Sequence, residues 1–321
     1  MAVLLRESDV RSLLTMPLAL AAVEESFLHL AAGKSILHPR QRIHFTDSAF
    51  LHYMAAGDSE SGYMALKIYT TVRGAYRFLV PLYRAKTGEL LALIEADYLG
   101  QMRTGAASGV ATRCLSRADA RTVGIIGTGL QARTQLEAIA LVRKLERIRA
   151  FGRNRDNLLK FCDEVSARLQ VSVEPAASCE HAVRGADIVV AATTASQPVV
   201  LGEWLAPGMH INAIGANFPQ KRELDSDAVS RASLIAVDSI AQSREEAGDL
   251  MQAYAGDEKR WAATVELADI LAGRARGRTG DGEITLFKSN GIAVWDLAAA
   301  ARVFEMARKE GIGQPIPLWG E

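Results

Sequence analysis

Hydrophobic and polar positions follow two different patterns along the chain, and the pattern changes near residue 115. After Thr122, short β-branched runs alternate with stretches whose apolar residues recur at helical spacing. The runs predicted to be strands cover residues 123–126, 148–151, 171–173, 188–193, 210–214 and 234–237. The helices predicted between them cover residues 131–142, 154–169 and 179–184. This alternation predicts an α/β fold with a doubly wound parallel sheet, the Rossmann arrangement.

The first part of the chain has extended segments joined by short turns. The pattern predicts a helix over residues 17–32 and a helix rich in small residues over 101–115. Between them, extended segments are predicted at residues 40–45, 49–55, 63–71, 78–84 and 90–95. Turns such as Lys86-Thr-Gly-Glu89 join these segments, so an antiparallel or mixed sheet is expected. A last helix is predicted over residues 292–309.

A glycine turn links the first strand of the alternating region to its helix. The sequence Thr122-Val-Gly-Ile-Ile-Gly-Thr-Gly-Leu-Gln-Ala132 contains the spacing G-x-G-x-x-A. Gly127 allows the tight turn, Gly129 lets backbone N–H groups approach a pyrophosphate, and Ala132 lets the helix pack closely on the sheet. We therefore predict dinucleotide contacts along the turn, at Gly127, Thr128, Gly129, Leu130, Gln131 and Ala132. An ordinary turn is the alternative interpretation.

The segment after residues 148–151 indicates which dinucleotide is bound. NAD-selective folds usually carry an acidic residue here, hydrogen-bonded to the ribose. This chain reads Gly152-Arg153-Asn154-Arg155, which places two guanidinium groups where a 2′-phosphate would lie. We predict NADP(H) in preference to NAD(H), with contacts from Arg153, Asn154 and Arg155. A solvated basic helix start is the alternative.

Two threonines follow the strand predicted to end near residue 193. Thr193 and Thr194 lie at its carboxyl end, where such folds bind ligands, so we predict that they line the nucleotide cleft. A turn whose hydroxyl groups cap its own backbone is an equal alternative.

Composition limits the partners. The 321 residues are 49% apolar, and 37 basic residues balance 37 acidic ones, so no net charge favours nucleic acid or a membrane over a small molecule. Apolar runs such as 188–192 are far short of a bilayer span, and Arg6, Glu7 and Asp9 precede any secretory core, so we predict a cytoplasmic protein. Three cysteines and six histidines lack metal-ligand spacing, and no metal is expected.

Four polar residues are candidates for substrate chemistry. Lys67 lies inside the apolar run Met64-Ala-Leu-Lys-Ile-Tyr, so it must either extend to water or lie in a cleft with a partner. Arg40 follows a proline, Arg103 opens the small-residue helix, and Asn217 follows a strand end. Taken singly, each is more often an ordinary surface group.

These residues recur in longer motifs. The chain contains His38-Pro-Arg40, Ala65-Leu-Lys67, Met102-Arg-Thr-Gly-Ala-Ala107, the turn Gly127-Thr-Gly-Leu-Gln-Ala132, Ala213-Ile-Gly-Ala-Asn217 with Pro219 and Arg222-Glu-Leu224, Glu246-Ala-Gly-Asp249, and Lys288-Ser-x-Gly291. With these motifs, the chain resembles the ornithine cyclodeaminase and mu-crystallin family over nearly its whole length. The resemblance implies a homodimer. It also implies a substrate-binding and dimerisation domain at residues 1–115 plus 292–321, beside a dinucleotide-binding domain at 116–291.

The resemblance also implies roles for individual residues. Arg40 and Arg103 are expected to hold a substrate carboxylate, and Lys67 to bond the same carboxylate or a water, or to pass a proton. Ser289 and Gly291 are expected at the nicotinamide end, and Thr104 at a phosphate or ribose. An α-imino acid needs its carboxylate held so that the imine carbon faces the nicotinamide.

Two departures from the family pattern favour a reductase. Where cyclodeaminases carry an aspartate, this chain has Asn217, which cannot accept a proton at neutral pH. Gly152-Arg-Asn-Arg155 resembles the NADPH-using members. We predict reduction of cyclic ketimine acids, Δ1-pyrroline-2-carboxylate or Δ1-piperideine-2-carboxylate, to proline or pipecolate. The alternatives are ornithine cyclodeaminase, an alanine dehydrogenase-like oxidoreductase, and a crystallin-like protein that binds NADPH and a small ligand.

Other titratable groups are interpreted as structural. Glu245, Glu246 and Asp249 have the spacing of a solvated helix start with carboxylates near its positive end. His44 and His52 lie on extended segments and are expected to be structural histidines rather than pocket residues.

Overall fold

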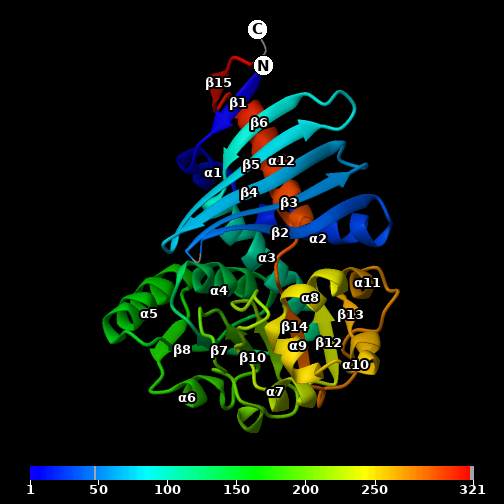
Figure 1. Ribbon diagram of the computed structural model, residues 1–321. Helices are drawn as coiled ribbons and strands as arrows, with labels where there is room; N and C mark the ends of the chain where they lie inside the picture. Colours follow the sequence, from blue (N-terminus) through cyan, green and yellow to red (C-terminus); the bar gives the residue numbers. More distant parts are fainter. Residues whose placement is uncertain (47, 319–321) are drawn as a thin grey trace. The chain divides into compact units, whose positions relative to one another are not determined.

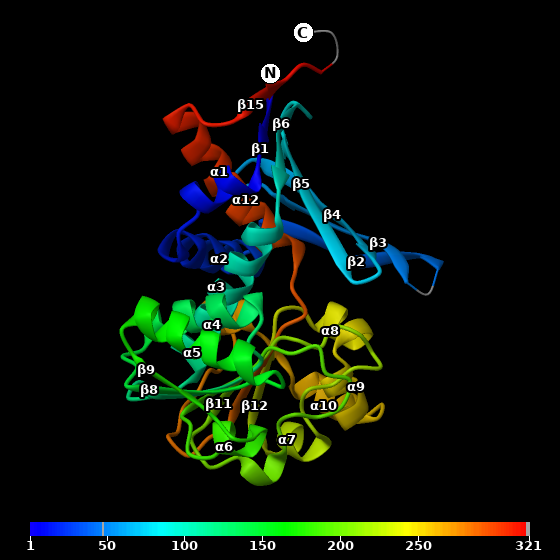
Figure 2. The ribbon, with the colours of Figure 1, turned by 90° about the vertical axis from the view of Figure 1, so that its left-hand side faces the viewer.

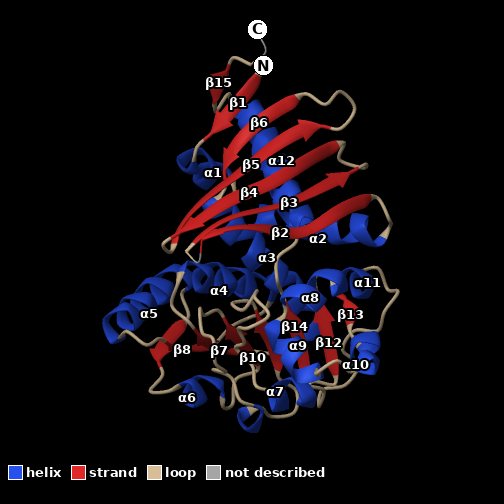
Figure 3. Ribbon diagram, in the orientation of Figure 1, coloured by secondary structure: helices blue, strands red, loops and turns tan. Residues whose placement is uncertain are grey.

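The computed structural model describes residues 1–46 and 48–318. Its chain forms two compact units. The first unit comprises Met1–Ala107 and Gly291–Glu321, and the second comprises Ser108–Asn290. The chain passes between them in α3 (Asp97–Leu115) and again at residues 290–291. Figures 1 and 3 show the elements of both units.

The first unit is built on a mixed sheet. Its strand order is β15-β1-β6-β5-β4-β3-β2. The bounds are β1 Ala2–Leu5, β2 Ser35–Thr46, β3 Ala49–Asp58, β4 Tyr63–Val72, β5 Ala75–Arg84, β6 Leu90–Glu95 and β15 Gln314–Ile316. All neighbouring strands pair in antiparallel fashion, except that β1 pairs with β6 in parallel. The sequence predicted an antiparallel or mixed sheet for this region, and the parallel pair of β1 and β6 makes it a mixed one.

Helices cover one face of this sheet. They are α1 (Glu7–Leu13), α2 (Met16–Ala31) and α12 (Ala293–Glu310), and α12 packs across β2 to β5 and against α2 (Figure 2). Alanines on the buried side of α12 permit this close approach, and the rings of Phe27 and Trp295 meet edge to face at 5.3 Å. Residues alternate along β4, so Lys67 and Tyr69 are buried while Met64 and Val72 on the opposite face are exposed.

The second unit is a parallel sheet with helices on both faces. Its strand order is β13-β12-β14-β11-β10-β7-β8-β9, and all its pairs are parallel. The bounds are β7 Thr122–Ile126, β8 Arg147–Phe151, β9 Ser172–Pro175, β10 Ile188–Ala191, β11 His210–Ala213, β12 Leu234–Val237, β13 Val265–Glu266 and β14 Thr285–Lys288. The order changes direction between β7 and β10, which makes the sheet doubly wound and confirms the predicted fold class.

Apolar residues fill both sides of the parallel sheet. On one side α4 (Leu130–Val142) and α5 (Arg155–Leu169) pack on the strands through Leu136 and Phe161. The other side carries α6 (Cys179–Val183), α7 (Ser226–Arg231), α9 (Gly248–Tyr254) and α10 (Glu258–Ala263). The remaining helical elements are η1 (Gly202–Trp204), α8 (Ile240–Glu246) and α11 (Leu267–Leu271).

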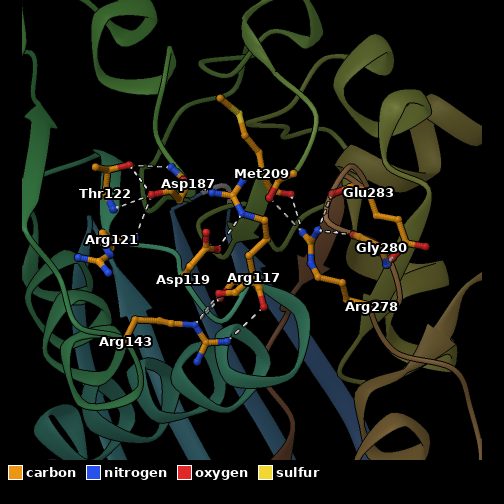
Figure 4. A network of polar contacts seen from close by, with 12 residues as sticks. Arg117, Asp119, Arg121, Thr122, Arg143, Asp187, Met209, Arg278, Gly280 and Glu283 are labelled. Carbon is orange, nitrogen blue, oxygen red and sulfur yellow. Dashed lines mark hydrogen bonds and ion pairs between the residues drawn. The ribbon is translucent and has the colours of Figure 1, made fainter.

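An ionic network joins the amino ends of β7 and β10 (Figure 4). The carboxylate of Asp187 accepts hydrogen bonds from the backbone N–H groups of Arg121 and Thr122, both at 2.9 Å, and pairs with Arg117 at 2.6 Å. Nearby, Arg143 donates to the carbonyl oxygens of Thr112 and Arg113 and so caps the end of α3. Ligands bind this fold at the opposite, carboxyl ends of the strands, so the network is structural.

The sequence predicted the long elements and several short ones, but it missed other short elements. The predicted strands and the helices over 131–142, 154–169 and 292–309 are present within a few residues. Strands β1, β13, β14 and β15 and the helices α1 and α7 to α11 were not foreseen, because segments this short carry little periodic signal. Among the described residues, no single helix is long and apolar enough to cross a membrane, and α1 and α2 reach that size only as a pair bent by 88°.

Candidate functional site

A cavity of about 600 Å³ opens at the carboxyl ends of three strands of the second unit. Its walls are the loops after β7, β8 and β10, which meet where the strand order reverses. The lining residues are Ile126, Gly127, Thr128, Gly129, Phe151, Gly152, Arg153, Asn154, Cys179, Ala192, Thr193, Thr194, Ala195 and Val199. Six residues predicted to contact a dinucleotide therefore share one cavity with Gly127.

The glycine turn shapes the floor of this cavity. Gly127 has φ +109°, and a Cβ there would overlap the carbonyl oxygen of Ala192. Gly129 caps the start of α4 without any side-chain hydrogen bond, and a Cβ built on it meets nothing within 4 Å. The cap residue therefore offers no side chain to the first N–H groups of α4 and leaves space beside itself, which suits the approach of a pyrophosphate. A dinucleotide fits these residues.

Arg133 holds the turn in place. Its guanidinium donates to the carbonyl oxygens of Thr128 and Gly129 at 2.9 and 3.1 Å and pairs with Glu164 on α5 at 2.7 Å. The other predicted turn residues differ in exposure: Ala132 is buried and Leu130 is 57% exposed. Close packing of α4 on the sheet agrees with an alanine at position 132.

The basic residues after β8 lie at the edge of the cavity. Arg153 and Asn154 line it, while Arg155 begins α5 and is not among the lining residues. The side chain of Asn154 accepts a hydrogen bond from the N–H of Asn157 at 2.8 Å and caps α5. Both arginines are exposed, so their guanidinium groups can reach a phosphate at low cost in desolvation.

The remaining predicted residues of the second unit lie on loops at the same sheet edge. The hydroxyl of Thr193 donates to Glu223 at 2.8 Å, and that of Ser289 donates to Asp238 at 3.2 Å. Asn217 is half-buried on the loop after β11. Thr104, on α3, donates from its hydroxyl to the carbonyl oxygen of Gly100 within the same helix at 2.7 Å. Thr104 belongs to the first unit, and its predicted contact with a phosphate or ribose stays a prediction.

Two buried cations meet one carboxylate in the first unit. Lys67 Nζ lies 2.6 Å from Asp296 Oδ1, and Arg103 Nε lies 3.1 Å from the same oxygen. The three residues are only 4%, 6% and 1% exposed. Aromatic rings flank the cations, with Lys67 5.3 Å from the ring centre of Phe78 and Arg103 5.6 Å from that of Trp295.

Arg40 joins this cluster from β2. The register between β2 and β3 shifts between His38 and Gln41, and such a bulge redirects a side chain. Arg40 is buried and donates from Nη2 to the carbonyl oxygen of Gly291 at 3.2 Å. Gly291 has φ +81°, which favours glycine, and a Cβ there would lie 2.6 Å from Nη1 of Arg103, so the guanidinium packs directly against this backbone. Three predicted residues, Arg40, Lys67 and Arg103, are thus brought together.

The cluster has more positive than negative charge. Burial, followed by the positive charge of Arg103, lowers the pKa of Lys67 to about 8, while Asp296 opposes this shift. Lys67 therefore remains mostly protonated at neutral pH but gives up its proton more readily than an exposed lysine. Such a set of donors can bind a small carboxylate through charge-assisted hydrogen bonds.

A row of rings continues from this cluster along the sheet. His52 stacks on Tyr69 at 4.3 Å, and Tyr69 lies 4.9 Å from Phe78. Burial, with the positive charges of Arg42 and Arg40, lowers the pKa of His52 to about 4, so this ring is neutral at physiological pH. His52 is thus buried and stacked in the sheet, whereas His44 is exposed.

One interpretation of the acidic residues is wrong. Glu246 and Asp249 are each 1% exposed and are not part of a solvated helix start, although Glu245 is exposed. Asp249 pairs with the equally buried Lys288 at 2.8 Å. The spacing of these acids fits a helix start, but it does not tell whether the helix end faces water or protein.

Sequence reasoning missed the partners of the buried cations. Asp296 was not singled out, although a carboxylate in the apolar stretch Ala293–Leu297 is a signal that a cation lies opposite. Glu223 and Lys288 lie in quoted motifs but received no role. Among residues 1–46 and 48–318, no three His, Cys, Asp or Glu side chains are placed to hold a metal ion.

Comparisons with known proteins agree with this arrangement. The sequence model of the ornithine cyclodeaminase/mu-crystallin family matches residues 1–311. A Δ1-pyrroline-2-carboxylate reductase of Bacillus cereus is 39% identical over 239 residues, which are 74% of this chain and 73% of the relative.

Two solved structures share the fold over almost all of both chains. The Δ1-pyrroline-2-carboxylate reductase of Thermococcus litoralis, in complex with NADH and L-proline, has a TM-score of 0.94 at 37% identity and covers 98% of this chain and 100% of its own. An archaeal alanine dehydrogenase dimer with bound NAD has a TM-score of 0.93 at 33% identity and covers 99% of each chain. The chain therefore belongs to the ornithine cyclodeaminase/mu-crystallin family, as its motifs predicted.

Proposed function

We propose that the protein is an NADPH-dependent imine reductase that converts cyclic ketimine carboxylates, Δ1-pyrroline-2-carboxylate or Δ1-piperideine-2-carboxylate, to proline or pipecolate. The observation that carries this proposal is the meeting of Lys67, Arg103 and Arg40 in the first unit, with Asp296 as the carboxylate that both Lys67 and Arg103 contact. The second unit supplies the glycine turn and cavity for the dinucleotide. A reductase named for the first of these imines is among the relatives.

The cationic cluster binds and orients the acid in this proposal. Arg103 presents a planar guanidinium to the substrate carboxylate, and Arg40 adds a second one. A carboxylate held at two points fixes the imine carbon relative to the reduced nicotinamide, which supplies the hydride when it is bound. Lys67 holds a proton at Nζ near neutral pH and can pass it toward the substrate nitrogen, because its pKa is lowered to about 8.

Asn217 favours reduction over cyclodeamination. Its amide can orient an imine nitrogen or a water by hydrogen bonds, but it cannot remove a proton from an amine at neutral pH. Reduction needs no such base, since the imine must gain a proton rather than lose one. We propose that Asn217 orients the substrate, and that Ser289, Gly291 and Thr104 contact the dinucleotide.

The function can be tested by substitution of Arg103. The unchanged protein should oxidise NADPH in the presence of either cyclic imine, followed by nicotinamide absorbance. Arg103→Met should raise KM and lower kcat together, with a loss in kcat/KM of about tenfold to a hundredfold, because binding and orientation are both weakened. Arg302→Met, which removes an exposed ion pair with Glu25, is the control and should change neither constant. Absence of turnover with every α-imino acid tried would contradict the proposal.

Cofactor preference is tested at the loop after β8. The dissociation constant of NADPH should be lower than that of NADH, since Arg153 lines the cavity and can pair with the 2′-phosphate. Arg153→Ala should weaken NADPH binding by about tenfold and leave NADH binding nearly unchanged. Nicotinamide fluorescence measures both constants, and tighter binding of NADH by the unchanged protein would show that the preference is wrong.

Substitution of two glycines of the turn tests folding and dinucleotide binding separately. Gly127→Ala should lower the melting temperature, because φ is +109° and the new methyl group overlaps a carbonyl oxygen. Gly129→Ala should fold normally, because its φ of −80° suits any residue and no atom lies near the methyl group. This second variant should still lose about tenfold or more in NADPH affinity, because the methyl group occupies pyrophosphate space. Unchanged affinity in Gly129→Ala would contradict the assignment of the turn.

We also propose that the first unit forms a homodimer through the sheet face opposite its helices. Tyr53, Ile68 and Leu79 are paired in one row across β3, β4 and β5, and their side chains share this face. Tyr53 and Leu79 are exposed, and so is Met64, which lies on the same face of β4 four residues before Ile68. An apolar sheet face of this kind is stabilised by a second apolar surface. One related structure is an alanine dehydrogenase dimer.

The dimer is tested by placing a charge on this face. Light scattering of the unchanged protein should give twice the chain mass of 34.6 kDa. Leu79→Glu should give the chain mass itself, because a buried unpaired carboxylate opposes association. Leu159→Glu, at a similarly exposed leucine on α5 of the other unit, is the matched control and should remain dimeric. A monomeric unchanged protein would rule out the proposed interface.

A further inference from the structure

Three buried charges of the second unit have no part in the reaction proposed above. Glu223, Asp249 and Lys288 are 0%, 1% and 0% exposed. They come from three separate motifs of the sequence, Arg222-Glu-Leu224, Glu246-Ala-Gly-Asp249 and Lys288-Ser-x-Gly291. Buried charges are costly unless they are paired and hydrogen-bonded, so the contacts that satisfy them indicate what they stabilise.

Glu223 ties two loops together. Its Oε1 accepts hydrogen bonds from the backbone N–H and the hydroxyl of Thr193 at 2.6 and 2.8 Å. Its Oε2 accepts from the N–H groups of Gly215 and Ala216 at 2.7 and 3.2 Å. All four partners are donors, so the ionised carboxylate fits this site although burial raises the pKa of Glu223. One side chain thus joins the loop after β10 to the loop after β11.

Asp249 and Lys288 close the network. Asp249 Oδ1 accepts from the N–H groups of Glu223 and Leu224 at 2.6 and 2.9 Å, and Oδ2 pairs with Lys288 Nζ at 2.8 Å. Lys288 in turn donates to the carbonyl oxygen of Ala216 at 2.5 Å. The contacts therefore run in a ring from Glu223 through Ala216, Lys288 and Asp249 back to Glu223.

The two loops are packed too closely to move independently. A Cβ built on Gly215 would overlap the carbonyl oxygen of Thr193 and lie 2.5 Å from Glu223 Oε1. The loop after β10 includes Thr193, Thr194 and Ala195, which line the cavity, and the loop after β11 continues directly into Asn217. A shift of the ring would therefore be transmitted to the cavity wall.

We propose that Glu223, Asp249 and Lys288 are positioning residues that hold the Thr193–Ala195 wall of the dinucleotide cavity and the turn before Asn217 in their working geometry. This inference rests on the proposed dinucleotide binding, not on the identity of the imine. It gives a physical reason why these three motifs accompany the glycine turn: they pre-organise one wall of the cavity whose floor the turn forms.

Asp249 gives the sharpest test because it does not line the cavity. In Asp249→Asn, an amide replaces a carboxylate that is surrounded by two N–H groups and an ammonium, so at least one donor loses its partner. The dissociation constant of NADPH, measured by nicotinamide fluorescence without any imine, should rise by about tenfold. Glu223→Gln should have an effect at least as large, since its amide nitrogen must face donors on one side.

Asp187→Asn is the matched control for damage to the fold. Asp187 also accepts from two backbone N–H groups and pairs with a cation, but at the amino ends of the strands (Figure 4). This variant should lower the melting temperature as the network variants do, yet keep NADPH affinity within about twofold of the unchanged protein. A loss of affinity in Asp249→Asn but not in Asp187→Asn would support positioning rather than general destabilisation.

Thr193 keeps the proposal testable if the charge variants fail to fold. Thr193→Val removes the hydroxyl that donates to Glu223 and should weaken NADPH binding by about threefold. Unchanged NADPH affinity in Thr193→Val, or in folded Asp249→Asn and Glu223→Gln, would overturn the inference. An unchanged protein that binds no dinucleotide would instead contradict the proposed function, on which the inference rests.

Discussion

A charge that leaves water needs a partner, and this requirement organises the interior of both units. In the first unit, the buried Lys67 and Arg103 share a single oxygen of Asp296. Neither cation would remain inside an apolar sheet and helix layer without that carboxylate, because the cost of desolvation exceeds what packing returns. Asp296 lies on α12, the helix that crosses the sheet, so the packing that builds the fold also brings the carboxylate to the cations.

The buried charges of the two units leave net charges of opposite sign. Around Asp296 the cations Lys67, Arg103 and Arg40 outnumber the carboxylate, and the excess positive charge is what the proposed binding of a substrate carboxylate would use. In the second unit, Lys288 faces Asp249 and Glu223, and the excess negative charge is met by backbone N–H groups. The first cluster therefore keeps a positive charge that Asp296 does not balance, whereas hydrogen bonds from the backbone satisfy the second. This difference in charge supports the proposed binding role of the first cluster and the proposed positioning role of the second.

The sequence predicted those features whose signal is local. Periodicity located strands β7 to β12 of the parallel sheet, and the spacing of Gly127 and Gly129 indicated the turn that the structure places on the cavity. Lys67 was a candidate because a lysine in an apolar strand is unusual. Its partner was not, because Asp296 lies 229 residues away and no pattern of one chain joins such distant positions. The burial of Asp249 was missed for the same reason, since it depends on a loop and a strand far along the chain.

The fold by itself does not determine whether the protein binds NADP(H) or NAD(H). Related structures with this arrangement hold NADH or NAD, and the glycine turn binds the pyrophosphate that both cofactors share. What differs between the cofactors is one phosphate on the ribose, so only charges that reach that position can discriminate. In this chain the proposed discriminating groups are the exposed guanidinium groups after β8, and the segment from Phe151 to Arg155 has no carboxylate to pair with ribose hydroxyls. We therefore expect cofactor selectivity to depend on a few surface side chains, so that it can change while the sheet, the turn and the buried ion pairs stay the same.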